Sequence, residues 1–119
     1  MILGVGVDIV DIARFTRAVE RAPKLVERLF APGEREFPVT SLAGRFAAKE
    51  AFIKAMGGSG EMTWHEVVIV KDEAGAPSFE LSGKATARAA DRGIDSFHLS
   101  ISHDANAAVA FVVAEGGAA

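Results

Sequence analysis

The stretch GRFAAKEAFIKAMGG, residues 44–58, combines apolar residues at helical spacing with four charged residues. At about 100° per residue it predicts the centre of a helix over 42–56, in which Leu42, Phe46, Ile53 and Met56 form one apolar stripe. Lys49 projects from the middle of that stripe. A lone charge at this place needs an explanation, because a core-facing stripe is normally apolar throughout.

The opposite face of this helix carries small residues and would let another element approach closely. These residues are Gly44, Ala48, Ala51 and Ala55. Ser41 is predicted to cap the helix, and the glycine-rich GGSG at 57–60 is predicted to end it.

The charges of this helix have two explanations that the spacing alone leaves open. Glu50 and Lys54 could form an ordinary i,i+4 surface pair while the stem of Lys49 runs along the core. Alternatively, the charged side chains of this helix bind a polyanionic ligand together with its metal ion. Glu50 would then hold a hard cation, while Arg45 and the lysines would hold phosphate oxygens.

The segment ILGVGVDIV at residues 2–10 alternates and predicts a strand. Leu3, Val5, Val7 and Ile9 fall on one face, and Asp8 shares the other face with two glycines, which leave room beside it. Asp8 alone is typical of a strand end. Paired with Glu50, it gives a candidate two-carboxylate Mg²⁺ site, since magnesium takes one or two carboxylates, waters and substrate phosphate oxygens.

The remaining pattern mixes helices and strands without a βαβ rhythm, which predicts a single α+β domain over 1–119. In the first part of the chain we expect a helix at 12–21, capped by Asp11 and interrupted at Pro23, then a further turn or two from 24 and a loop or short helix at 31–39. In the second part we expect strands at 65–72 and 77–82 and a helix at 83–93. The chain should close with a hairpin of 96–102 with 107–114 and a frayed tail at 115–119.

His103 ends a row of alternate apolar residues just before the turn of the predicted hairpin. It is either a surface turn histidine or a phosphate contact or acid–base group. His65 and His98 have no such context and are interpreted as structural.

Composition narrows the possible function. Half of the 119 residues are hydrophobic, there is no cysteine, and the net charge is −3. These values exclude a disulfide scaffold and a thiolate zinc site, fit a reducing cytoplasm, and argue against non-specific nucleic-acid binding. The apolar N-terminus is too short and too soon followed by aspartates for a signal peptide or membrane span.

A basic stripe lies on the predicted helix 12–21 and just beyond it. Arg14, Arg17 and Arg21 recur at i, i+3 and i+7, and Lys24 follows. Such a stripe is either a solvated face or a docking surface for an acidic partner.

Three segments in this order resemble the holo-(acyl-carrier-protein) synthases, the small bacterial 4′-phosphopantetheinyl transferases. They are GVGVDIVDIARF at 4–15, LAGRFAAKEAFIKAMG at 42–57 and HLSISHDANAAVAFVV at 98–113, and ERLFAPGEREF at 27–37 is similar more loosely. The resemblance implies an antiparallel sheet packed against a long helix, homotrimers with active sites at subunit interfaces, and a role in fatty acid biosynthesis.

The resemblance also implies roles for individual residues. Asp8 and Glu50 match the Mg²⁺ ligands, and Lys54 matches the lysine beside the coenzyme A (CoA) pyrophosphate; these three are the candidate catalytic residues. Arg14 matches the main contact for acyl carrier protein, with Arg17, Arg21 and Lys24 extending that surface. The candidate CoA contacts, some of them from a neighbouring subunit, are Arg45, Lys49, Lys54, Gly57, Ser59, Gly60, Ser102 and His103.

The implied reaction moves 4′-phosphopantetheine from CoA to a carrier-protein serine and releases adenosine 3′,5′-bisphosphate (3′,5′-ADP). The base that accepts the serine proton stays open between Glu50, a water on the metal and a nearby carboxylate. A nucleotide hydrolase or kinase fits less well, because neither glycine-rich stretch is a P-loop or a dinucleotide fingerprint. A non-enzymatic alternative is a regulatory module that binds CoA. Such a module would need the basic phosphate contacts but not both of the carboxylates Asp8 and Glu50.

Overall fold

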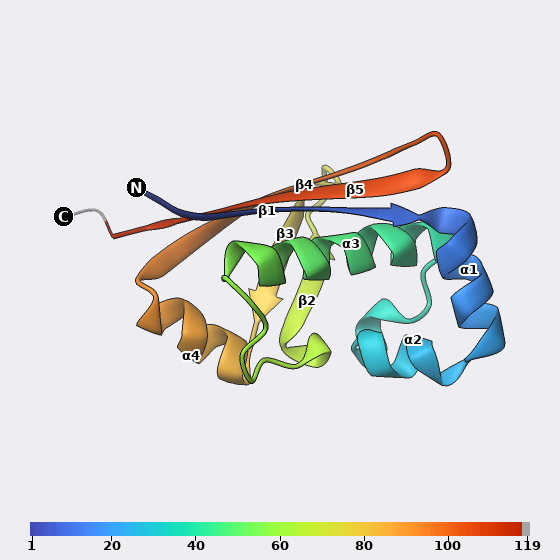
Figure 1. Cartoon of the computed structure of the whole chain (residues 1–119), viewed down its shortest axis with the longest axis horizontal. Helices are drawn as coiled ribbons and strands as arrows, with labels where there is room; N and C mark the ends of the chain where they lie inside the picture. Colours follow the sequence, from blue (N-terminus) through green and yellow to red (C-terminus); the bar gives the residue numbers. More distant parts are fainter. Residues whose placement is uncertain (118–119) are drawn as a thin grey trace.

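The computed structural model describes residues 1–117 and contains two antiparallel sheets. The larger sheet has the strand order β1-β5-β4, and a two-stranded sheet pairs β2 with β3 (Figure 1). The strands are β1 (Ile2–Asp11), β2 (Val67–Lys71), β3 (Pro77–Leu81), β4 (Ile94–Asp104) and β5 (Ala107–Gly116). The terminal hairpin β4–β5 turns at Ala105 and Asn106, which both have the positive φ of a tight two-residue turn.

The long helix α3 (Val39–Ala55) runs along one face of the three-stranded sheet (Figure 1). The remaining helices lie toward the two ends of the molecule. They are α1 (Ile12–Arg21), α2 (Lys24–Leu29) and α4 (Gly83–Asp91), with single 3₁₀ turns η1 (Pro32–Glu34) and η2 (Trp64–Glu66). The predicted α+β class and the long helix against an antiparallel sheet are confirmed.

The small-residue face of α3 packs directly on β1. A Cβ atom added at Gly4 would overlap the carbonyl oxygen of Ala55, and one added at Gly6 would overlap that of Ala51. Ala48, Ala51 and Ala55 are buried. Strand and helix backbones therefore touch without intervening side chains, which sets Asp8, two residues after Gly6, close to α3.

The other face of β1 is apolar and exposed. Val5, Val7 and Ile9 are 52–68% exposed, and Phe111 on β5 lies opposite Val7 and is 44% exposed. Alternation along β1 thus separates a face that packs on α3 from a face that carries large apolar side chains into solvent.

Two details of the predicted elements are wrong. Helix α3 begins at Val39 after Pro38, whose carbonyl accepts the first helical hydrogen bond from Leu42 at 3.0 Å, so Ser41 lies inside the first turn and is not its cap. Residues 115 and 116 belong to β5, where Gly116 pairs with Ile94. Residues 118 and 119 of the predicted frayed tail lie outside the described part of the chain.

The other predicted elements are present, but residues 65 and 66 of the predicted strand 65–72 lie in η2, and β4 extends beyond the predicted 96–102 at both ends. The carboxylate of Asp11 caps α1 by accepting a hydrogen bond from the Arg14 backbone N–H at 3.0 Å. Ile12 and Phe15 are buried and seat this helix. Within residues 1–117, no helix is long and apolar enough to cross a membrane.

The contact between β1 and α3 can be tested by filling the space at Gly6. We expect Gly6→Ala to lower the free energy of unfolding by about 1–3 kcal/mol, because the new methyl group overlaps backbone that cannot move away cheaply. Urea unfolding followed by circular dichroism would measure the loss. Gly33→Ala is the control, since a Cβ there meets nothing within 4 Å; equal stability of both variants would contradict the prediction.

Candidate active site

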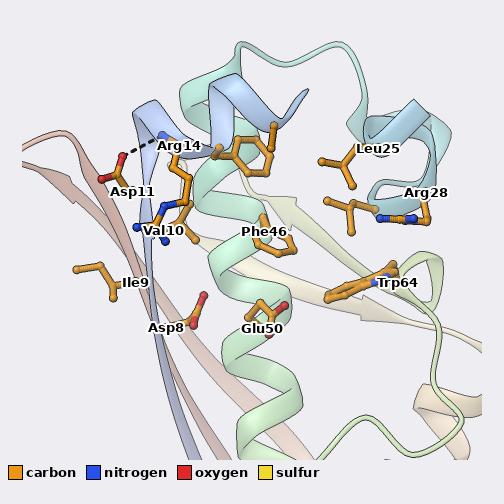
Figure 2. A pocket seen from close by; sticks show the side chains of 13 residues that line it. Asp8, Ile9, Val10, Asp11, Arg14, Leu25, Arg28, Phe46, Glu50 and Trp64 are labelled. Atoms are coloured by element: carbon orange, nitrogen blue, oxygen red, sulfur yellow. Dashed lines mark hydrogen bonds between the residues drawn. The ribbon is translucent and has the colours of Figure 1, made fainter. Parts of the chain in front are cut away.

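The two predicted metal-binding carboxylates lie on neighbouring elements and face the same space. Asp8 comes from β1 and Glu50 from α3, and both line a pocket of about 550 Å³ (Figure 2). The contact of Gly4 and Gly6 with α3 is what lets two residues 42 positions apart in the sequence share one site.

The electrostatics of the pocket show that the two acids interact. Burial raises the pKa of Glu50, the negative charge of Asp8 raises it further, and Lys54 partly offsets these effects. Lys54 Nζ donates to Asp8 Oδ1 at 3.1 Å and to the Val7 carbonyl oxygen at 3.0 Å. Two carboxylates with one flanking ammonium therefore leave a negative site that favours a cation.

This donor set fits magnesium. Within residues 1–117, no group of three or more histidine or acidic side chains is close enough to hold a metal unaided. Asp8 and Glu50 supply two hard oxygen ligands. Magnesium commonly takes that number and fills its other positions with waters and phosphate oxygens.

An aromatic wall extends the pocket away from the carboxylates. Phe46 stacks on Phe15 with ring centroids 5.6 Å apart, and it also packs at 5.6 Å against Trp64. All three side chains line the same pocket as Asp8 and Glu50. The site therefore has a charged end and an apolar end.

The basic stripe begins at the wall of this pocket. Arg14 lines the pocket from α1 (Figure 2), while Arg17, Arg21 and Lys24 are exposed on α1 and α2. Arg28, which is not among the residues predicted from the sequence, lines the pocket from α2. It follows Lys24 at i+4, so extending the helical spacing by one turn was the signal that could have found it.

Arg45 and Lys49 point away from the carboxylate pair into a buried ion cluster. Lys49 Nζ donates to Glu34 Oε1 at 2.8 Å and to the Trp64 carbonyl oxygen at 3.0 Å. Arg45 Nη1 lies 3.5 Å from Glu34 Oε2, which also accepts from the Ile69 backbone N–H at 3.1 Å. The cluster ties α3 to η1, η2 and β2.

Lys49, a CoA contact according to the resemblance, is buried in this cluster. Its side chain is 0% exposed and already paired with Glu34. Burial lowers the pKa of Lys49, and the hydrogen bond that its ammonium donates to Glu34 counters that effect. A lysine within an apolar stripe signals a buried acidic partner, but nothing in the sequence identified Glu34 as that partner.

The remaining candidate residues lie at the two ends of α3. The turn 57–60 follows its C-terminal end, and Gly57 and Gly60 there have positive φ, while Ser59 is exposed. His103 lies near the N-terminal end, where its ring rests on Gly44 and lines a second pocket with Arg45; Ser102 is exposed beside it. In one protomer, the structure therefore does not bring His103 to Asp8 and Glu50.

The other two histidines make local contacts. His65 Nε2 lies 2.7 Å from the Glu27 carbonyl oxygen, and His98 Nε2 lies 2.8 Å from Glu115 Oε1 across β4 and β5. Neither residue lines the pocket of Asp8 and Glu50.

Residues 4–112 match the model of the 4′-phosphopantetheinyl transferase superfamily. The chain belongs to this superfamily. A holo-[acyl-carrier-protein] synthase of Clavibacter michiganensis subsp. michiganensis is 58% identical to this phosphopantetheinyl transferase superfamily member over 118 residues, covering 99% of each chain.

Solved structures of holo-[acyl-carrier-protein] synthases share the superfamily fold seen here. The Helicobacter pylori protein in complex with coenzyme A is 38% identical, with a TM-score of 0.83 over 93% of this chain and 99% of that one. The Bacillus anthracis protein in complex with CoA (3′,5′-ADP) is 32% identical, with a TM-score of 0.81 over 98% and 99%.

The buried ion cluster of this superfamily member predicts a large effect of one substitution. We expect Glu34→Ala to lower the free energy of unfolding by about 3–5 kcal/mol, because it leaves Arg45 and Lys49 buried without a carboxylate. Urea unfolding at pH 7 would measure it, with Glu36→Ala as the exposed control on the same segment. A loss for Glu34→Ala no larger than that of the control would contradict the role of the cluster.

Proposed function

We propose that this protein transfers 4′-phosphopantetheine from CoA to a serine of apo acyl carrier protein, releasing adenosine 3′,5′-bisphosphate. The observation that carries the proposal is the pair Asp8 and Glu50 in one pocket, beside Lys54. The relatives support it, since they are holo-[acyl-carrier-protein] synthases, one of them in complex with coenzyme A. Fatty acid biosynthesis follows from this reaction, and a chain without cysteine fits the reducing cytoplasm.

We infer that Asp8 and Glu50 hold Mg²⁺, which when bound neutralises charge on the CoA pyrophosphate. Lys54, already 3.1 Å from Asp8, is 55% exposed and free to place its ammonium on a pyrophosphate oxygen. Positioning and charge neutralisation account for most of the catalysis in phosphoryl transfer.

In the reaction, the carrier serine oxygen forms a bond to the β-phosphorus, the one bearing pantetheine. The bond from that phosphorus to the bridging oxygen breaks, and 3′,5′-ADP leaves with the electron pair. The serine proton passes to a base, and Glu50 is a candidate because its carboxylate lines the pocket in which the reaction would take place. A water in the site and a nearby carboxylate remain alternatives.

The carrier protein would dock on α1 and α2. Arg14 and Arg28 line the pocket, and the same two helices expose three further cations, which are Arg17, Arg21 and Lys24. Acyl carrier proteins are acidic, so this surface would speed association and weaken with salt.

We also propose a homotrimer with sites shared between subunits. The exposed apolar side chains of β1 and β5 give a continuous surface that a second copy would bury; these are Val5, Val7, Ile9 and Phe111. Because His103 and Arg45 lie apart from Asp8 in one protomer, a neighbouring subunit would have to supply them to the bound CoA. A monomer in sedimentation equilibrium would contradict this assembly.

The transfer can be tested by weighing apo acyl carrier protein after incubation with CoA and Mg²⁺. We expect wild type to add the mass of phosphopantetheine, and Asp8→Asn and Glu50→Gln to react at least about 100-fold more slowly, because each removes one metal ligand. Glu73→Gln, on the exposed β2–β3 turn, is the matched control. No mass gain with wild type under any condition would favour a CoA-binding module instead.

The docking surface can be tested separately from CoA binding. We expect Arg14→Ala to raise the KM for carrier protein about tenfold while the KM for CoA stays within about twofold, since the guanidinium faces the rim of the pocket. The difference should shrink as salt is added, because surface charges are screened. An equal rise in both KM values would contradict the assignment, and Lys84→Ala on α4 controls for a general loss of positive charge.

A further inference from the structure

Two arginines converge on the carbonyl group that follows the last residue of α3. Arg88 on α4 donates a hydrogen bond from Nη2 to the Met56 carbonyl oxygen at 3.2 Å, and Arg92, directly after α4, donates from Nη1 to the same oxygen. Met56 is buried, and α4 lies at the end of the molecule where α3 ends (Figure 1). One carbonyl oxygen therefore accepts from two guanidinium groups.

The way in which α3 ends explains why the Met56 carbonyl needs an outside donor. Gly57 has positive φ and the helix closes with a Schellman motif, in which Gly58 N–H donates to the Ile53 carbonyl at 3.0 Å and Gly57 N–H donates to the Lys54 carbonyl at 3.1 Å. These two bonds satisfy carbonyl groups within the last helical turn. The carbonyl of Met56 lies beyond them, and the arginines supply its donors.

The same guanidinium groups lie against the glycine-rich turn 57–60. A Cβ atom added at Gly60 would lie 2.8 Å from Arg88 Nη1, and one added at Gly57 would lie 3.1 Å from Arg92 Nη1. Arg88 Nε is buried, and within residues 1–117 no atom accepts a hydrogen bond from it. A buried donor without an acceptor costs free energy, so the placement of Arg88 points to a role other than stability.

Electrostatics supply a reason for two cations at this place. The last carbonyl groups of a helix carry a partial negative charge, which disfavours an anion nearby. Turn 57–60 directly follows this end of α3, and CoA, which the turn contacts according to the resemblance, is a polyanion. Guanidinium groups at the Met56 carbonyl offset the negative helix end and fix the turn at the same time.

We propose that Arg88 and Arg92 are positioning residues that hold turn 57–60 in the conformation that binds CoA. This proposal rests on the proposed function, because it concerns how the same substrate is held. The two arginines act through the Met56 carbonyl and the turn, not by touching CoA. Helices α1 and α2, which carry the proposed docking surface, lie at the opposite end of the molecule (Figure 1), so carrier-protein docking is independent of these arginines.

The kinetic test uses Arg88→Met and Arg92→Met, which keep an unbranched side chain but remove the donors. We expect each to raise the KM for CoA about tenfold, as loss of one charge-assisted hydrogen bond implies, while kcat and the KM for carrier protein stay within about twofold. Arg88→Lys and Arg92→Lys should recover part of the loss, because an ammonium keeps the charge and a donor. Lys84→Met is the matched control, since this α4 cation pairs with Glu61 and not with Met56.

Amide hydrogen exchange distinguishes positioning from direct contact with CoA. In the protein without CoA, we expect segment 57–63 to exchange about tenfold faster in Arg88→Met and Arg92→Met than in wild type or Lys84→Met, because fewer bonds then hold the turn. Exchange resolved by mass spectrometry would measure this. Arg92 is exposed, so Arg92→Met keeps the test available if Arg88→Met does not fold.

Three results would overturn the proposal: an unchanged KM for CoA, an equal rise in the KM for CoA and for carrier protein, or a rise for CoA without faster exchange in the turn. The last result would mean that a guanidinium group contacts CoA itself. If wild type transfers no phosphopantetheine, the proposed function fails instead, and calorimetric titration with CoA decides the role of the arginines. Binding about tenfold weaker in Arg88→Met than in Lys84→Met would support that role, and equal binding would count against it.

Discussion

The close contact between β1 and α3 is the constraint on which the site depends. Gly6 and Ala51 let two backbones touch where any larger side chain would separate them. Asp8 and Glu50 extend from these two backbones, so the distance between the carboxylates is set by the packing of small residues rather than by a loop. Sites built on regular elements hold their geometry better than sites on loops, and a pair of acids that share one cation needs that accuracy.

The same packing brings the negative charges of Asp8 and Glu50 close enough to repel each other. Burial and the charge of Asp8 both raise the pKa of Glu50, so this environment destabilises the ionised form of Glu50. Lys54 offsets only part of this, because its ammonium pairs with Asp8 and is largely exposed. A bound cation would remove the repulsion, which couples metal binding to deprotonation of Glu50.

The sequence predicts features that follow from the local periodicity of strands and helices. Strand alternation placed Asp8 on the glycine face, helical spacing placed Ala51 on the contact face of α3, and both placements are confirmed. The sequence does not predict features that depend on contacts between residues far apart in the chain. Glu34 lies between prolines in a segment without periodicity, so its burial against Lys49 could not be read from either pattern. Ser41 was mistaken for a cap because Pro38 starts the helix earlier.

Alternation along β1 links the site to the outer face of the sheet. Each residue that approaches α3 is followed by one that points the other way, so the strand that holds Asp8 also exposes Val7 and Ile9. Phe111 continues this surface on β5. An assembly that buries the exposed apolar face of β1 and β5 would therefore pack β1 between a neighbouring subunit and α3. The position of Asp8 would then depend on protein concentration as well as on the fold, because association stabilises whichever arrangement of β1 it binds.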